Sequence, residues 1–234
     1  MEIRHEGRFA PLRGVKPRAL LAALLLRPGN AVSLDALTEA LWDGEPPRSA
    51  VANLRSYACL IRQQLPVQDD LVSLGAGYEL RATGADRDHI LFERLSTDGR
   101  QLLASAPDRA AGLLTDALAL WSGDTAASGV ERRGLLSGAL SHLDEERIRT
   151  AEDLATAWLS LDEPRSALRE ARQVLDMQPL RVRSWSVVLS AHHLLGEHGQ
   201  VSRAYDSACT AFRRELGTEP DPGLRRLHRE LRAG

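Results

Sequence analysis

Cysteine, aromatic residues and lysine are scarce in this chain of 234 residues. Its two cysteines, Cys59 and Cys209, lie far apart, so we expect no disulfide framework and a reducing environment. Residues 1–6 lack the hydrophobic region of a signal peptide, and the apolar run at 19–26 is too short to cross a bilayer. These absences favour a cytoplasmic protein that does not contact a membrane.

Patterns typical of enzymes and metal sites are also missing from the sequence. His192, His193 and His198 lie close together, but no cysteine or acidic residue completes a metal-binding spacing with them. The residues at 75–77 lack the lysine and the strand-to-helix setting of a phosphate-binding loop. We therefore expect no enzymatic activity, no cofactor and no metal ion.

Positive charge is concentrated in parts of the chain. Lys16 is the only lysine, and the formal net charge of −2 argues against a uniformly basic surface for nucleic acid. The segments 8–34 and 46–68, however, contain no acidic residue. A locally basic surface on a near-neutral chain is compatible with DNA binding, because only the contacting face must meet phosphate.

The segment 48–65 has the pattern of an amphipathic helix between prolines. Its apolar residues recur at steps of three and four, at Val51, Leu54, Ala58, Ile61 and Leu65. The opposite side carries three arginines spaced by seven and small residues between them, namely Arg48, Arg55, Arg62, Ser49, Ala52, Ser56 and Cys59. Such a helix fits a DNA major groove. The periodicity alone leaves open an ordinary helix with a solvated basic edge.

Two helices precede this segment and a hairpin follows it. The Ala- and Leu-rich run at 15–27 predicts the first helix, and Ser33 stands where it caps a second helix over 34–42. Strand-like runs at 71–74 and 78–81 flank a Gly-rich turn. Residues 1–14 are expected to hold one or two short strands. Helix, helix, longer helix and hairpin is the order of a winged helix, in which the third helix enters the groove.

Nearly all of the chain after residue 86 is predicted to be helical. The apolar pattern indicates helices over 90–106 and 107–121, followed by a loop of small residues at 122–129. A long helical stretch follows at 131–161, and a break near Gly138 stays open.

The last third of the chain contains an internal repeat of 34 residues. The first copy has the anchor positions of a tetratricopeptide repeat at Ala151, Leu154, Ala155, Trp158, Ala167, Ala171, Val174 and Pro179. The second copy has Trp185, Val188, Leu189, His192, Val201, Tyr205, Ala208 and Arg213. Ala110, Leu114 and Ala117 fit a third, degenerate unit. This spacing predicts stacked helical hairpins. Trp121, Trp158 and Trp185 are interpreted as packing residues, and a cavity for a small effector is the alternative.

The sequence therefore predicts a mainly α-helical protein of two domains. Residues 1–84 form an N-terminal winged helix-turn-helix domain with a small β-hairpin. Residues 85–234 form an all-α, tetratricopeptide-like helical repeat domain.

Several stretches resemble a known family of regulators. They are residues 16–26, 32–42, 77–78, 92–95, 117–123 and 215–224, of which the last, with two prolines and a glycine, is the most specific. Together they resemble the Streptomyces antibiotic regulatory protein family. Its members join an OmpR-type winged helix to a bacterial transcriptional activation domain built of tetratricopeptide-like helices.

The resemblance implies a transcriptional activator of a secondary-metabolite (antibiotic) gene cluster. Such a protein binds direct repeats in double-stranded DNA, acts as a homodimer on DNA and recruits RNA polymerase holoenzyme; a small-molecule effector stays open. The recognition helix would be 50–65. The implied DNA-binding residues are Lys16, Arg18, Arg48, Asn53, Arg55, Ser56, Tyr57, Arg62, Gly77 and Tyr78. Arg55 and Arg62 would contact bases or phosphates, Lys16 and Arg18 would hold phosphate, and Gly77 and Tyr78 would place the hairpin.

Two departures from the family pattern support a second hypothesis. Leu60 and Gln63 stand where the family commonly has arginine or lysine, and the N-terminal stretch is short. Fewer cations release fewer counterions from DNA. The second hypothesis is a tetratricopeptide-like adaptor, or an effector-binding regulator, with a weakened DNA-binding domain.

Overall fold

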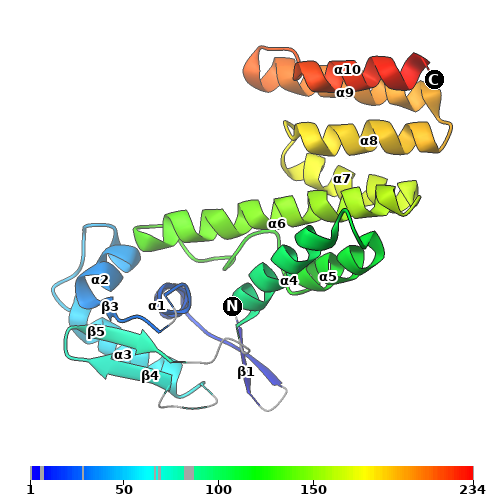
Figure 1. Cartoon of the computed structure of the whole chain (residues 1–234). Helices are drawn as coiled ribbons and strands as arrows, with labels where there is room; N and C mark the ends of the chain where they lie inside the picture. The colour runs from blue at the N-terminus through cyan, green and yellow to red at the C-terminus, as the bar shows by residue number, and fades with distance from the viewer. Residues whose placement is uncertain are drawn as a thin grey trace. The chain divides into compact units, whose positions relative to one another are not determined.

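The computed structural model describes residues 2–5, 8–27, 29–65, 67, 70–81 and 87–233 (Figure 1). The chain forms two compact units. The first contains residues 1–91 and 121–145, and the second contains residues 92–120 and 146–234. The predicted fold class is confirmed, because helices dominate and the small strands lie in the N-terminal part. The predicted border between residues 84 and 85 lies outside the described residues.

The first unit holds all of the described strands and three short helices. The elements that lie wholly in it are, in chain order, β1 (Glu2–His5), β2 (Arg8–Pro11), α1 (Val15–Leu25), β3 (Val32–Ser33), α2 (Leu34–Trp42), α3 (Ala50–Arg62), β4 (Leu71–Leu74) and β5 (Gly77–Leu80). β1 and β2 pair antiparallel, so the expectation of one or two short strands near the N-terminus is confirmed, with two. β4 and β5 form the predicted hairpin, and β3 pairs with β5 to complete an antiparallel sheet in the order β3-β5-β4.

Packed leucines and alanines hold the first unit together. Helix α1 contacts both α2 and α3, and its side chains Leu20 and Leu24 are fully buried. Leu37 on α2 and Leu54 on α3 are buried as well. Burial of each such side chain stabilises the fold by about 1.5–3 kcal/mol before the entropy of ordering it is counted. This core fixes which face of α3 points away from the unit.

Helix α3 is shorter than predicted, and its buried face differs at one position. It ends at Arg62, and residues 63–65 form a turn rather than the expected last helical turn. The prediction that Val51 belongs to the buried face is wrong, since Val51 is 39% exposed. Ala50 is buried in its place, because Ala50, Leu54 and Ala58 lie in one row at steps of four.

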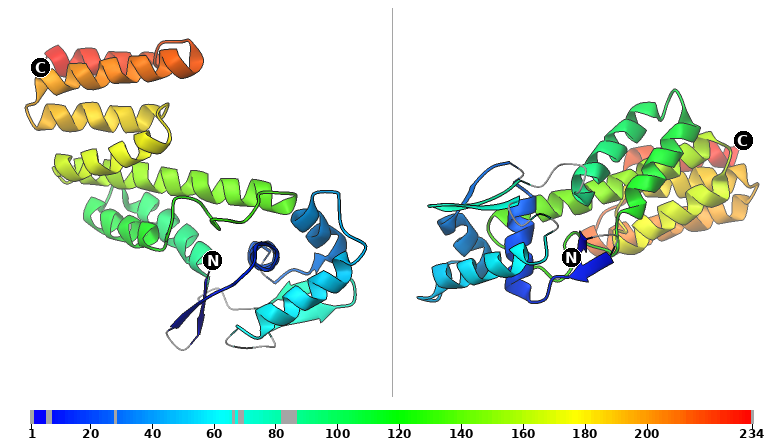
Figure 2. Two further views of the ribbon diagram at one scale, coloured as in Figure 1. Left: turned by 180° about the vertical axis from the view of Figure 1, so that it is seen from behind. Right: turned by 90° about the horizontal axis from the view of Figure 1, so that it is seen from below.

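The second unit is built from consecutive helices, which are joined by short loops except for the longer connection between α5 and α6 (Figure 2). The helices that lie partly or wholly in it are α4 (Asp88–Leu102), α5 (Pro107–Ala119), α6 (Leu135–Ser160), α7 (Pro164–Met177), α8 (Val182–Leu194), α9 (His198–Leu216) and α10 (Pro222–Ala233). Their bounds agree with the helical hairpins that the 34-residue period predicts.

Small anchor residues lie where the helices meet. Ala155, Ala167 and Ala171 are fully buried in one cluster that also holds residues of α8. Ala110 and Leu114 of α5 pack against the part of α6 around Leu154. Because alanine lets two helix backbones approach closely, these positions explain the period of the sequence.

Helix α6 is continuous, so the break left open near Gly138 does not occur. Glycine inside a helix is unfavourable by only about 1 kcal/mol relative to alanine. Leu136 and Leu140, on either side of Gly138, are buried and offset that penalty. The helix starts at Leu135 rather than at residue 131.

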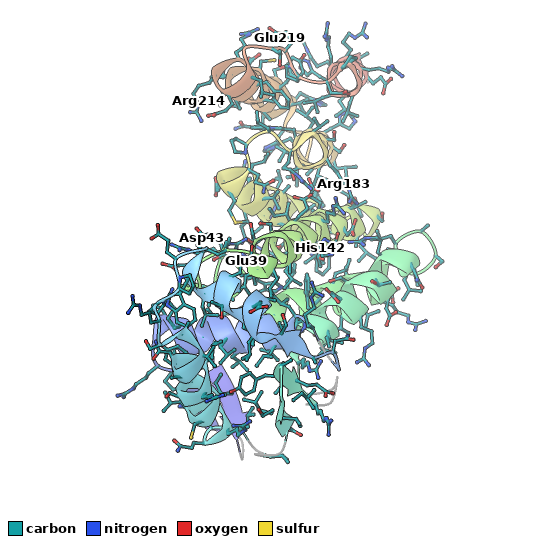
Figure 3. The ribbon with its side chains drawn as sticks, turned by 90° about the vertical axis from the view of Figure 1, so that its left-hand side faces the viewer. Glu39, Asp43, His142, Arg183, Arg214 and Glu219 are labelled. Atoms are coloured by element: carbon teal, nitrogen blue, oxygen red, sulfur yellow. The ribbon has the colours of Figure 1, made fainter. Side chains whose placement is uncertain are left out.

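Two buried carboxylates on α6 tie the second unit together. Glu152 accepts hydrogen bonds from Arg181 (Nη2 to Oε2, 2.6 Å) and from the hydroxyl of Ser184 (2.9 Å). Asp153 pairs with Arg100 of α4 (2.7 Å) and with Arg183 of α8 (2.5 Å), which is labelled in Figure 3. Buried carboxylates need such partners, because an unpaired charge away from water is strongly unfavourable.

Among the described residues, no helix has the length and apolar character needed to cross a membrane.

Candidate nucleic-acid interface

The outward face of α3 is exposed and contains no acidic side chain. Its exposed residues are Val51, Ala52, Arg55, Ser56, Cys59 and Leu60. The Ser56 hydroxyl donates to the carbonyl of Ala52 (3.1 Å), which leaves its oxygen able to accept a further bond. An exposed face without negatively charged side chains can contact the negatively charged surface of DNA.

Arg48 and Arg55 supply the positive charge of this face. Both side chains are exposed, and neither forms an ion pair with any described residue. Arg55 lies near the middle of α3, whereas Arg48 precedes the helix. A guanidinium without an internal partner is available to a phosphate or to the O6 and N7 atoms of guanine.

Asn53 and Tyr57 border the exposed face. Both are half-buried, and the Asn53 amide lies 3.3 Å from the hydroxyl of Ser49 in the turn before α3. Their side chains line one edge of the helix.

The structure gives Arg62 an internal role. Its Nε donates to the carbonyl of Leu71 in β4 (2.9 Å), and its guanidinium lies 5.9 Å from the ring centre of Tyr78 in β5. Arg62 is half-buried. It therefore links the end of α3 to the hairpin, unlike Arg55.

Gly77 and Tyr78 belong to the sheet. A Cβ atom on Gly77 would lie 2.1 Å from the carbonyl oxygen of Val32, so only glycine fits this approach of β5 to β3. Tyr78 is 4% exposed. These two residues position the hairpin, and its turn at 75–76 is exposed.

Lys16 and Arg18 on α1 also contact groups of the first unit. The Lys16 ammonium donates to the carbonyl of Leu41 and lies 3.6 Å from the carboxylate of Glu131. Arg18 donates from Nε to the carbonyl of Gly14 (3.3 Å). Both side chains are half-buried.

Sequence reasoning missed the role of the segment 121–134, which packs within the first unit. Arg133 pairs with Asp43 at the end of α2 (3.7 Å), the residue labelled in Figure 3. Gly134 lies against the backbone of Ala40, where an added Cβ would be 3.4 Å away. The run of charged residues at 131–133 was the available signal, but it does not identify a partner.

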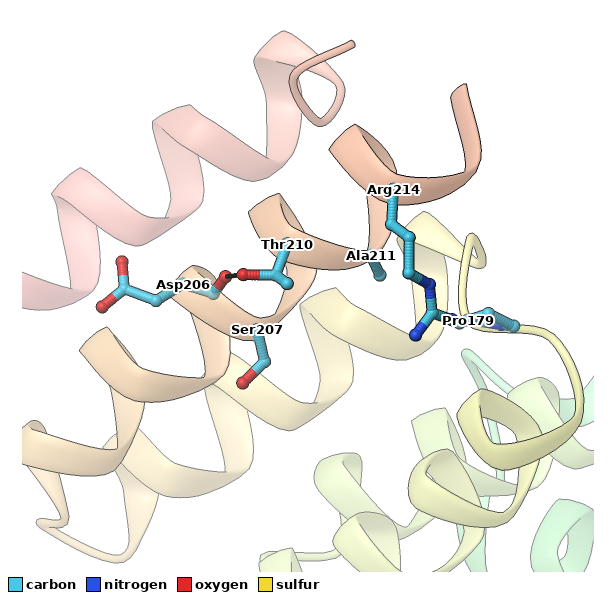
Figure 4. Close-up of a pocket in the computed structure, with 6 residues that line it drawn as sticks. All are labelled: Pro179, Asp206, Ser207, Thr210, Ala211 and Arg214. Atoms are coloured by element: carbon cyan, nitrogen blue, oxygen red, sulfur yellow. Dashed lines mark hydrogen bonds between the residues drawn. The ribbon is translucent and has the colours of Figure 1, made fainter. Parts of the chain in front are cut away.

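The second unit has a hollow of about 420 Å³ along α9 (Figure 4). It is lined by Pro179, Asp206, Ser207, Thr210, Ala211 and Arg214. Thr210 donates to the backbone carbonyl of Asp206 (2.9 Å), so its hydroxyl proton is already used. One acidic and one basic side chain, Asp206 and Arg214, line the hollow. These two do not form an acid–base pair suited to catalysis.

A neighbouring hollow of about 370 Å³ lies between α7, α8 and α9. His192 in its wall is buried and lies between Arg172 (3.2 Å from Nε2) and Glu197 (2.6 Å from Nδ1). Trp185 packs against the cluster around Leu189 and Val201, and its indole nitrogen donates to the carbonyl of Pro179 (2.8 Å). It also lines this hollow, so the structure is compatible with both interpretations of this residue.

Comparison with known proteins gives a consistent result. The family described as "Bacterial transcriptional activator domain" matches residues 87–232. The transcriptional regulator RedD of Streptomyces coelicolor is 31% identical over 229 residues, which cover 95% of this chain and 65% of RedD. The regulatory protein DnrI of Streptomyces peucetius is 28% identical, with 98% of this chain and 88% of DnrI covered.

The regulatory protein AfsR of Streptomyces griseus is 31% identical, but the match covers 92% of this chain and only 22% of AfsR. The chain therefore spans less than two thirds of the length of RedD and AfsR. Among solved structures, Mycobacterium tuberculosis EmbR, determined in complex with a low-affinity phosphopeptide, has a TM-score of 0.86 at 24% identity. That match covers 97% of this chain and 61% of EmbR, and it shows a shared fold.

Proposed function

Since this chain belongs to the bacterial transcriptional activator domain family and to the Streptomyces antibiotic regulatory proteins, we propose that it is a DNA-binding transcriptional regulator. The observation that carries the proposal is the outward face of α3. It is acid-free, it is exposed along the length of the helix, and it has Arg55 near its centre. A helix with these properties can enter a major groove of B-DNA and present side chains to base edges.

We assign the proposed contacts by what each side chain can reach. Arg55 donates to guanine or phosphate, Ser56 and Asn53 offer hydrogen bonds at the same surface, and Arg48 and Tyr57 contact the DNA backbone. Lys16, Arg18 and Arg62 act chiefly by holding α1, α3 and the hairpin in place, as their internal contacts support. Gly77 and Tyr78 position the hairpin, and the turn of this hairpin approaches the DNA backbone.

The finer proposal is an activator of a secondary-metabolite gene cluster. In it, two copies bind side by side on direct repeats and recruit RNA polymerase, with residues 1–84 contacting DNA and residues 85–234 serving activation. The family supports this proposal, as do the relatives RedD and DnrI, which are named as regulators. A protein that acts on chromosomal DNA works in the cytoplasm.

A gel-shift titration tests the proposal most simply. The purified chain is titrated against a promoter fragment from its own gene neighbourhood and against an unrelated fragment of equal length and base composition. We expect the promoter fragment to shift at least tenfold lower in protein concentration. Equal binding to both fragments would contradict the proposal of a specific regulator.

A second candidate function is an adaptor or effector-binding regulator with weakened DNA binding. The internal contacts of Lys16, Arg18 and Arg62 favour it, because they leave Arg48 and Arg55 as the main cations around α3. Salt dependence separates the two candidates. The logarithm of the binding constant falls with the logarithm of salt concentration by about 0.9 per neutralised phosphate. A slope near zero would favour the adaptor.

A further inference from the structure

Two aliphatic side chains are exposed on α3 at the surface proposed to meet DNA. Val51 is 39% exposed and Leu60 is 45% exposed. They are nine residues apart, which corresponds to about two and a half helical turns, so they lie on opposite edges of the exposed face. Arg55 and Ser56 lie between Val51 and Leu60, both along the helix axis and around the exposed side of the helix.

The chemistry of a base pair gives these two edges a common partner. In the major groove a T·A pair presents the C5-methyl group of thymine at the end next to its own strand, and polar groups towards the middle. A helix centred in the groove therefore brings its middle to the polar groups and its two edges to thymine methyls of opposite strands. Aliphatic side chains gain nothing from phosphate, but they bury well against a methyl group.

We propose that Val51 and Leu60 determine sequence specificity by contacting the C5-methyl groups of two thymines on opposite strands. This inference rests on the function proposed above. Arg55, midway between them, donates to a guanine in the same site. Nine residues extend about 13.5 Å along a helix, which corresponds to a separation of up to about four base pairs. The site read by one α3 is thus a guanine bracketed by one thymine on each strand.

Replacing thymine by deoxyuracil tests this proposal, because it removes only the methyl group. The full chain first selects duplexes from a random-sequence library, and the tightest duplex is resynthesised with single thymine-to-deoxyuracil replacements on each strand. We expect two replacements for each bound copy of the chain, one per strand, each to weaken binding about fourfold, as expected for one buried methyl group. All other replacements should change binding less than twofold.

Variants connect each methyl group to its side chain. Val51→Ala should abolish the sensitivity to deoxyuracil on one strand, and Leu60→Ala should abolish it on the other. Val15→Ala, which removes the same atoms from an exposed valine of α1, is the matched control and should retain both sensitivities. Thermal unfolding confirms that each variant is folded. Because Val51 and Leu60 are exposed, the melting temperatures of Val51→Ala and Leu60→Ala should match that of the parent chain.

The outcomes distinguish this inference from the proposed function. Sequence-selective binding that is insensitive to every deoxyuracil replacement would overturn the methyl contacts and leave the regulator proposal standing. Weakened self-association of Val51→Ala and Leu60→Ala with unchanged DNA binding would overturn the inference in favour of a protein interface. Failure of the chain to bind any duplex would overturn both proposals.

Discussion

Two arginines of α3 show how one residue type serves two purposes. Arg55 and Arg62 are seven residues apart, so the helical period predicts that both lie on the same side of α3. Arg62 nevertheless donates to Leu71 of β4, whereas Arg55 is exposed and has no ion-pair partner among the described residues. The difference depends on a hairpin that begins only after the helix ends. Helical periodicity cannot predict it, because it contains no information on which strand packs against the helix end.

Gly77→Ala is expected to destabilise the first unit. The added Cβ would overlap the carbonyl oxygen of Val32 at 2.1 Å, so β3 and β5 must separate. Overpacking of this kind lowers the free energy of unfolding by about 1–3 kcal/mol. Urea denaturation followed by circular dichroism measures it. Gly112→Ala, at an open position of α5, is the control and should be neutral or stabilising. Equal stability of Gly77→Ala and the parent would contradict the close approach.

The two cysteines should differ in reactivity towards N-ethylmaleimide. Burial raises the pKa of the Cys209 thiol, so it forms little of the reactive thiolate at neutral pH. Cys59 is exposed on α3 and should react first. Mass spectrometry after short exposure checks the order. Bound specific DNA should slow the alkylation of Cys59 and leave that of Cys209 unchanged. Unchanged alkylation of Cys59 in the complex would place α3 outside the groove.

At the scale of elements, local signals predict some boundaries well and others poorly. α2 agrees with its predicted range of 34–42, because Ser33 accepts a hydrogen bond from the backbone N–H of Ala36 at its start. Asp43 in the left-handed conformation ends it. The continuity of α6 through Gly138 depends instead on buried leucines on both sides of that residue. Such tertiary packing overrides the weak local preference of one glycine.

The link between α6 and α8 should depend on Glu152. In Glu152→Gln the buried side chain keeps its shape but loses its charge, so Arg181 and Ser184 lose a charged acceptor. We expect the free energy of unfolding to fall by about 1–3 kcal/mol. Chemical denaturation of the full chain measures the loss. Glu93→Gln, at an exposed position of α4, is the control and should change stability by less than about 0.5 kcal/mol.

At the scale of the whole molecule, the order of elements was predictable and the assignment of one segment was not. Helix periodicity, turn residues and the 34-residue repeat each predict structure within a short window of sequence. The inclusion of residues 121–145 in the first unit depends on contacts between distant residues, such as Lys16 with Glu131 and Asp43 with Arg133. No local pattern specifies those partners.

The candidate site was predictable to the same extent. The exposed face of α3, including Arg55 and Ser56, follows from amphipathic spacing. Hydrophobic periodicity assigned Val51 to the buried face, and Leu60 was noted only as a departure from the family's basic pattern. Neither was therefore recognised as an exposed apolar group that a ligand could contact. Which apolar side chains of α3 are buried depends on how the helix is rotated about its axis. Burial of Ala50 and Leu54 fixes that rotation, and only the three-dimensional structure shows it.

The central claim is that the outward face of α3 reads DNA through Arg55. Fluorescence anisotropy of a labelled promoter duplex, titrated with parent chain, Arg55→Ala and Arg165→Ala, tests it most directly. Arg165 is exposed on α7 and forms no ion pair with the described residues, so its variant removes the same charge elsewhere. Loss of an arginine–guanine contact corresponds to about 1–3 kcal/mol of discrimination. The account predicts binding at least fivefold weaker for Arg55→Ala and within twofold of the parent for Arg165→Ala. Equal affinities of the two variants would contradict it.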